Sequence, residues 1–173
     1  MRLWLLDAPA ASSMRILAVA MVVPESRFER AAALQRADIA SRIFVPVQVD
    51  GKRGGPNIIS KGLADLMARV AHIPGFEVIP MDEVEPISLN AARQIRDYLT
   101  NEHVRSVIVV TPGFRSSRSF LVYNTVLSPA GINVGCVPVF GLTDRNNWTK
   151  TWHGIQDVAL QFMKLQYYRF YVL

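Results

Sequence analysis

The stretch TPGFRSSRSF, residues 111–120, gathers two arginines, three serines and a Pro-Gly pair immediately after the apolar run SVIVV. Ser116 or Ser117 falls where the next helix would begin, and a helix start presents free N–H groups and a partial positive charge. Arg115 and Arg118 are three residues apart, so one side of a helical turn carries both. Because arginine holds phosphate through paired hydrogen bonds, we expect this turn to bind an anion. A serine-capped helix start with two solvated arginines is the alternative interpretation.

Other candidate ligand contacts also follow predicted strands. The loop DGKRGGPN, residues 50–57, would let the backbone approach a ligand at its paired glycines, although a plain surface loop is the alternative. An acidic residue follows the first strand, and a polar asparagine lies near the start of an otherwise apolar-patterned helix. The predicted ligand-binding residues are Thr111, Arg115, Ser116, Arg118, Asn90, Gly54, Gly55 and Glu25.

Apolar runs of strand length alternate along the chain with helical patterns, and these elements must position the candidate residues. This alternation predicts an α/β domain with a mainly parallel sheet between helix layers. In such a sheet, ligands bind outside the carboxyl ends of the strands, where the candidate segments fall. Helical spacing places five apolar residues on one side of the second helix: Ile59, Leu63, Leu66, Met67 and Val70. Strands are predicted at 16–23, 42–49, 76–80, 106–110 and 132–140, and helices near 26–37, 58–73, 87–103, 116–128 and 153–168.

Length and charge limit the classes of protein that remain. The 173 residues are enough for one domain with a core, with residues 1–13 as a flexible or edge segment. Half the residues are hydrophobic and 19% are charged, which excludes a disordered chain. The net charge of +5 favours anionic partners. The arginines are scattered, so we expect no nucleic-acid partner.

Cysteine, histidine and membrane signals are weak. Cys136 is the single cysteine and lies in the apolar run GCVPVF, which is typical of a small buried side chain. The three histidines are far apart in sequence, and we expect no metal site. No apolar run has the length of a membrane-spanning helix, so we expect a cytoplasmic protein. The C-terminal MKLQYYRFYV could seal the sheet edge, pack on a partner subunit or touch a membrane surface peripherally.

The order of these features resembles the YdcF/SanA/ElyC-type family of bacterial proteins, a domain of unknown function. The segments that carry the resemblance are SRFERAAALQRADIASRIFVP, ISLNAARQI, VTPGFRSSRS and WTKTWHGIQDVALQFMKLQYYRF. Asn90, Thr111 and Arg118 stand at positions that match the family motifs. Leu89 stands where the family has glutamate, and Arg115 where it has histidine.

The resemblance implies a three-layer Rossmann-like sandwich of about five strands and a role in cell-envelope or surface-polysaccharide biogenesis. It also implies S-adenosylmethionine or a nucleotide-like molecule as a ligand. Two alternatives stay open beside a binding protein. One is a transferase or hydrolase acting on envelope precursors, for which Glu25, Asp50 and Asp82 are the available general bases. The other is a structural or interaction protein whose ligand site has degenerated.

Overall fold

The computed structural model describes residues 14–18, 25–51 and 55–173. For residues 14–18 and Glu25 this description covers the backbone only. The segment 1–13, Gly54 and residues 19–23 of the first predicted strand lie outside this description. The strands are β1 (Met14–Ala18), β2 (Arg42–Gln48), β3 (Glu77–Met81), β4 (Ser106–Pro112) and β5 (Asn133–Val139). The helices are α1 (Glu25–Arg36), α2 (Ile58–Val70), α3 (Ile87–Asn101), α4 (Ser116–Leu127) and α5 (Trp152–Tyr167). Shorter turns are η2 (Gly113–Arg115), η3 (Ser128–Ala130), η4 (Trp148–Lys150) and η5 (Tyr168–Val172).

The five strands are parallel and lie in the order β3-β2-β1-β4-β5. In the central register, Ile16 of β1 stands beside Ile43 of β2 and Ile108 of β4. The predicted mixed α/β class is confirmed, and each predicted element has a counterpart in the structure. The chain moves from β1 toward β3 and then returns past β1 to β4, so the direction of winding reverses at β1.

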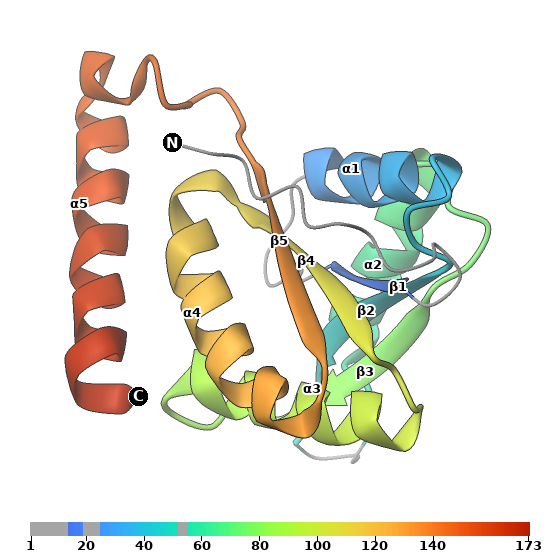
Figure 1. Ribbon diagram of the computed structural model, residues 1–173. Helices are drawn as coiled ribbons and strands as arrows, with labels where there is room; N and C mark the ends of the chain where they lie inside the picture. The colour runs from blue at the N-terminus through green and yellow to red at the C-terminus, as the bar shows by residue number, and fades with distance from the viewer. Residues whose placement is uncertain (1–13, 19–24, 52–54) are drawn as a thin grey trace.

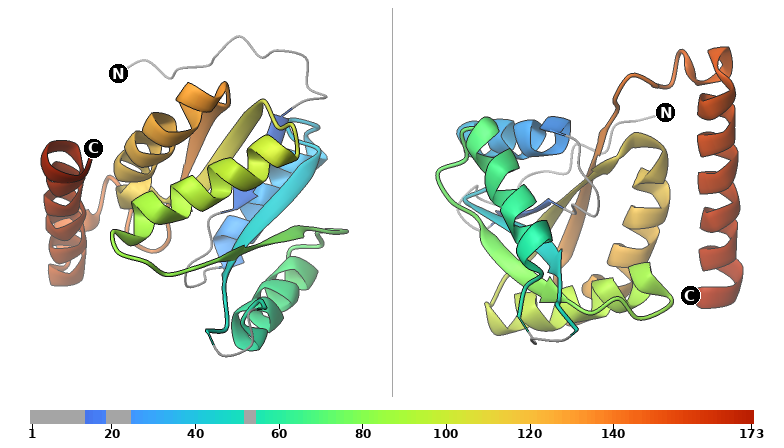
Figure 2. Two further views of the ribbon diagram at one scale, coloured as in Figure 1. Left: turned by 90° about the horizontal axis from the view of Figure 1, so that it is seen from below. Right: turned by 180° about the vertical axis from the view of Figure 1, so that it is seen from behind.

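Each face of the sheet has its own apolar core. Alternate residues of β4 point to opposite faces, with Val107 and Val109 in one core and Ile108 and Val110 in the other. Helices α3 and α4 supply the first core, and α1 and α2 supply the second (Figure 1 and Figure 2). Residues Ser106 to Thr111 of β4 are all buried, which agrees with the apolar run in the sequence.

Helix α2 meets the sheet through its small side chains. Ala64 and Ala68 are buried, whereas Leu63 and Leu66 are exposed and Ile59 is 81% exposed. Most of the apolar side that the spacing identified therefore faces away from the core, although Met67 of that side packs against it. Alanine lets the helix lie close to the strands, and the long aliphatic side chains then point outward.

Helix α5 lies outermost, alongside α4 and away from the sheet (Figure 1). Its first turn is fitted closely against the chain before it, because a Cβ at Gly154 would meet the carbonyl oxygen of Trp148 at 2.2 Å. No helix within the described ranges is long and apolar enough to cross a membrane.

Candidate functional site

The reversal of winding at β1 places the topological switch point of the sheet at the carboxyl ends of β1 and β4. Helix α1 leaves β1 toward one face of the sheet, and α4 leaves β4 toward the other. The starts of these two helices therefore flank the same strand ends. In open α/β sheets this is the place where ligands bind.

The turn after β4 is held by short-range contacts. Thr111 is fully buried, and its hydroxyl lies 3.1 Å from that of Ser119. Ser116 donates its hydroxyl hydrogen to the carbonyl oxygen of Gly113 at 2.7 Å, and helix α4 has no side-chain cap. Gly113 lies under the ring of Phe140, where a Cβ would come within 2.2 Å. The side chains of Thr111 and Ser116 thus position the turn, and neither serine cap that the sequence suggested is formed.

Three arginines come together at this switch point, and we call Arg27, Arg115 and Arg118 the arginine cluster. Arg27 lies on the first turn of α1 and is 5% exposed, while Arg118 lies on the first turn of α4 and is 7% exposed. Burial, and then the charge of Arg115, lower the pKa of Arg27 to about 10. The same two causes, in the same order, lower the pKa of Arg118. Arg115 is therefore the common neighbour of the other two guanidinium groups.

Two members of the cluster, Arg115 and Arg118, hold positive charge that no carboxylate of the described residues neutralises. The buried Nε of Arg115 has no hydrogen-bond partner among the described residues. Arg118 packs its guanidinium over the ring of Tyr168, 5.6 Å from the ring centre, and no carboxylate of the described residues pairs with it. No carboxylate of the described residues contributes to the pKa shift of Arg118. Desolvated cations of this kind are costly unless an anion accompanies them.

The remaining predicted ligand contacts are engaged elsewhere or fall outside the description. Asn90 donates to the carbonyl oxygens of Val84 and Glu85 at 3.1 and 3.0 Å, and accepts from Arg93 at 3.2 Å. The carbonyl oxygen of Gly55 accepts from the backbone N–H of Asp50 at 2.7 Å, within its own loop. Neither residue is hydrogen-bonded to the arginine cluster. Gly54 and the side chain of Glu25 lie outside the described residues.

Among the described residues, no group that could act as a base or a reactive nucleophile is paired with Arg115 or Arg118. The thiol of Cys136 lies 3.6 Å from the carbonyl oxygen of Ser116, and burial raises its pKa to about 12. Asp82 follows β3 at the edge of the sheet, where its backbone exchanges hydrogen bonds with the side chain of Gln94. Within the described ranges, no three His, Cys, Asp or Glu side chains gather as metal ligands would.

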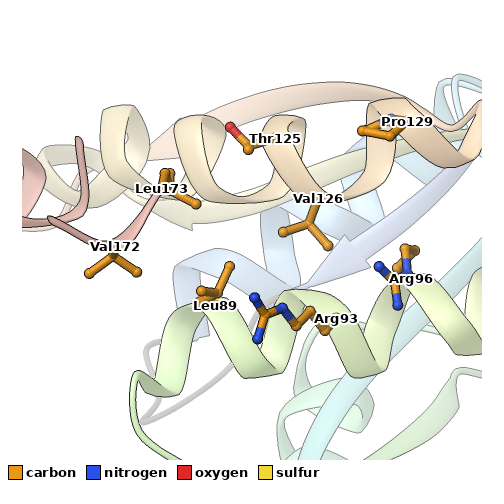
Figure 3. A pocket seen from close by; sticks show the side chains of 8 residues that line it. All are labelled: Leu89, Arg93, Arg96, Thr125, Val126, Pro129, Val172 and Leu173. Carbon is orange, nitrogen blue, oxygen red and sulfur yellow. The ribbon is translucent and has the colours of Figure 1, made fainter. Parts of the chain in front are cut away.

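A hollow of about 270 Å³ lies between α3 and α4, apart from the arginine cluster (Figure 3). Its two cations have partners, because Arg96 pairs with Asp97 at 2.7 Å and Arg93 donates to Asn90. Thr125 in its wall is seven residues beyond Arg118 on α4, which corresponds to about 10 Å along a helix. The lining is Leu89, Arg93, Arg96, Thr125, Val126, Pro129, Val172 and Leu173, and it includes none of the predicted ligand contacts.

The structure brings Arg115 and Arg118 together as the sequence predicted, and it adds two residues that the sequence analysis missed. Arg27 could have been found, because it is a basic residue within one turn of the first predicted strand. Tyr168 could not, since it lies 50 residues beyond Arg118 and reaches it only through the packing of α5 on α4.

Comparison with known proteins adds no further assignment: no model of a protein family matches the chain, and no curated protein is significantly similar to it.

Proposed function

We propose that the protein binds a small phosphate-bearing molecule at the switch point beside β1 and β4, with the arginine cluster as its anion site. The observation that carries this proposal is the buried Nε of Arg115, which has no hydrogen-bond partner among the described residues. The almost complete burial of Arg118 without a carboxylate partner supports it. An incoming phosphate would supply the negative charge that both guanidinium groups lack, through paired hydrogen bonds.

The finer identity of the protein is part of the same proposal. The strand order and the helices on both faces support classification as a three-layer Rossmann-like sandwich, and with it a nucleotide-like ligand. Membership of the YdcF/SanA/ElyC-type family, and the envelope role and S-adenosylmethionine ligand that it implies, rest on the sequence motifs alone. We favour binding over turnover, because the described residues place no carboxylate, imidazole or reactive thiol against Arg115 and Arg118.

Calorimetric titration with inorganic pyrophosphate tests the anion site. We expect the wild-type protein to bind, and Arg118→Ala to weaken binding by about 1–3 kcal/mol because a charged hydrogen bond is removed. Arg93→Ala is the matched control, because it also removes an arginine side chain, but Arg93 lies on α3 and bonds to Asn90 within the fold. Equal affinity of the wild type and Arg118→Ala would contradict the proposal.

A wider panel identifies the ligand class. Nucleotides, sugar phosphates and S-adenosylmethionine should be compared by the increase that each causes in the unfolding temperature. Stabilisation by phosphate-bearing members that Arg118→Ala abolishes supports the proposal. Silence across the panel, with no binding of pyrophosphate, would favour a protein whose ligand site has degenerated.

A further inference from the structure

Helix α5 and the turn η5 that extends it touch the rest of the molecule along one narrow stripe. Gly154, Gln161 and Tyr168 are buried, one residue in every seven. Val158 and Leu165 are half-buried between them. This spacing of three and four residues describes a single line along a helix, so most of the circumference faces away from α4.

The outward side of this helix is apolar. Trp152 is 72% exposed and Phe170 is 70% exposed. At 100° per residue, the exposed apolar side chains cover the half of the helix opposite the buried stripe. Gln156 is exposed within this half, yet an exposed apolar surface of this extent usually marks an interaction site. The exposed members are Trp152, Ile155, Leu160, Phe162, Met163, Tyr167, Phe170 and Tyr171, and we call them the α5 face.

The charges around the α5 face are unbalanced. Residues 145–173 contain four basic side chains and one acid, Asp157, whose carboxylate accepts a hydrogen bond from Gln161 at 3.3 Å. Lys164 and Arg169 are both exposed on the same helical segment. A second copy of the chain would bring the same cations together. An anionic surface would complement them.

Helix α2 provides a contrast within the same molecule. It also exposes aliphatic side chains, among them Ile59, but it carries no aromatic residue. Its basic Lys61 is paired with Asp65 at 2.8 Å, which cancels the local charge. Of these two helices, only α5 with its η5 extension combines exposed aromatic rings with cations that pair with no carboxylate of the described residues.

We propose that the α5 face docks on the surface of a membrane that contains anionic phospholipids. The helix lies parallel to the bilayer, with its aromatic side chains at the boundary between headgroups and acyl chains. Lys164 and Arg169 extend to the headgroup phosphates while their methylene groups stay beside the apolar face. This docking does not depend on the phosphate site of the arginine cluster.

Co-sedimentation with phospholipid vesicles tests the docking. We expect the full chain to bind vesicles of about 30% phosphatidylglycerol in phosphatidylcholine at least about tenfold more tightly than phosphatidylcholine alone, and more weakly as salt rises. The double variant Phe162→Glu, Phe170→Glu should reduce binding at least about tenfold, because both side chains lie on the α5 face. The control is Ile59→Glu on α2, which should bind as the wild type does.

Two further measurements keep the outcome decisive. The emission of Trp152 should shift to the blue on anionic vesicles, and Trp152→Phe should remove that shift. The charge reversal Lys164→Glu, Arg169→Glu leaves the apolar side chains intact and should also weaken binding at low salt. Failure of the wild type to bind anionic vesicles, or undiminished binding by both double variants, would overturn the proposal. A dimer in light scattering that Phe162→Glu, Phe170→Glu dissociates, without vesicle binding, would overturn it in favour of a second copy.

Discussion

Arginines at the two ends of the sheet have pKa values shifted in opposite directions. At the amino end, Arg42 begins β2 and donates from Nε to Glu77 at 2.5 Å, from a terminal nitrogen to the second oxygen of Glu77, and to Glu102 at 2.9 Å. Hydrogen bonds to these two carboxylates raise the pKa of Arg42 well above its ordinary range. At the carboxyl end, burial and mutual repulsion lower the pKa of Arg27 and Arg118.

This difference separates a charge that the fold neutralises from the charges of Arg115 and Arg118, which the described residues leave without a carboxylate. Folding itself supplies the anions that surround Arg42, so its charge is satisfied whenever the chain is folded. The arginine cluster is desolvated to a greater degree, yet the described residues give Arg115 and Arg118 no carboxylate. A fold that retains such a cost at the strand ends is expected to recover it from a ligand.

Removing the carboxylate at the amino end should cause the largest change in stability. Glu77→Gln leaves Arg42 with half of its ion pairs, and we expect the free energy of unfolding to fall by about 1–2 kcal/mol, since the site is partly exposed. Urea unfolding measures this. Asp97→Asn, which breaks the exposed pair with Arg96, is the control and should cost less than about 0.5 kcal/mol. Equal losses for the two variants would show that the ion pairs of Arg42 stabilise the fold no more than an exposed surface pair does.

Removing Arg115, the central cation at the carboxyl end, should not lower the free energy of unfolding. Arg115→Met keeps the aliphatic volume and relieves the repulsion on Arg27 and Arg118, so in ligand-free buffer the free energy of unfolding should stay equal or rise by up to about 1 kcal/mol. Arg42→Met, the counterpart at the amino end, should lower it. A loss above about 1 kcal/mol for Arg115→Met would assign Arg115 a structural partner and remove the contrast between the two ends.

The exclusion of water from the carboxyl end of the sheet can be measured through the thiol of Cys136. At neutral pH the burial of this thiol should have little effect on stability. Burial raises the pKa of its thiol to about 12, whereas the unfolded thiol ionises near about 8.5. Between these values the unfolded chain binds fewer protons, so stability should fall as the pH rises above about 8.5. Iodoacetamide at pH of about 8 should alkylate the native protein at least about tenfold more slowly than the urea-unfolded protein. Equal rates would mean that water reaches the thiol.

The strands and helices could be predicted because their signals lie within a few neighbouring residues. The contacts between side chains at the site could not, because they join residues far apart in the sequence. The apolar run of β4 and the Pro129–Gly131 stop after α4 can be recognised within a few residues, and Gly131 indeed adopts the left-handed conformation. Periodicity located α2 but could not say which of its sides meets the sheet. The pair Arg42–Glu77 and the stacking of Arg118 on Tyr168 join residues 35 and 50 positions apart, and only the topology brings them together.

The response of stability to phosphate tests the arginine cluster most directly. Thermal unfolding of the wild type should be compared in phosphate and in chloride at equal ionic strength, beside Arg115→Ala. At a phosphate concentration 100 times the Kd, the folded state should gain about 2.7 kcal/mol, which corresponds to a rise of about 5–10 °C in Tm. The Tm of Arg115→Ala should be the same in phosphate as in chloride. An equal rise in the wild type and the variant, or no rise in either, would contradict an anion site at the carboxyl edge of the sheet.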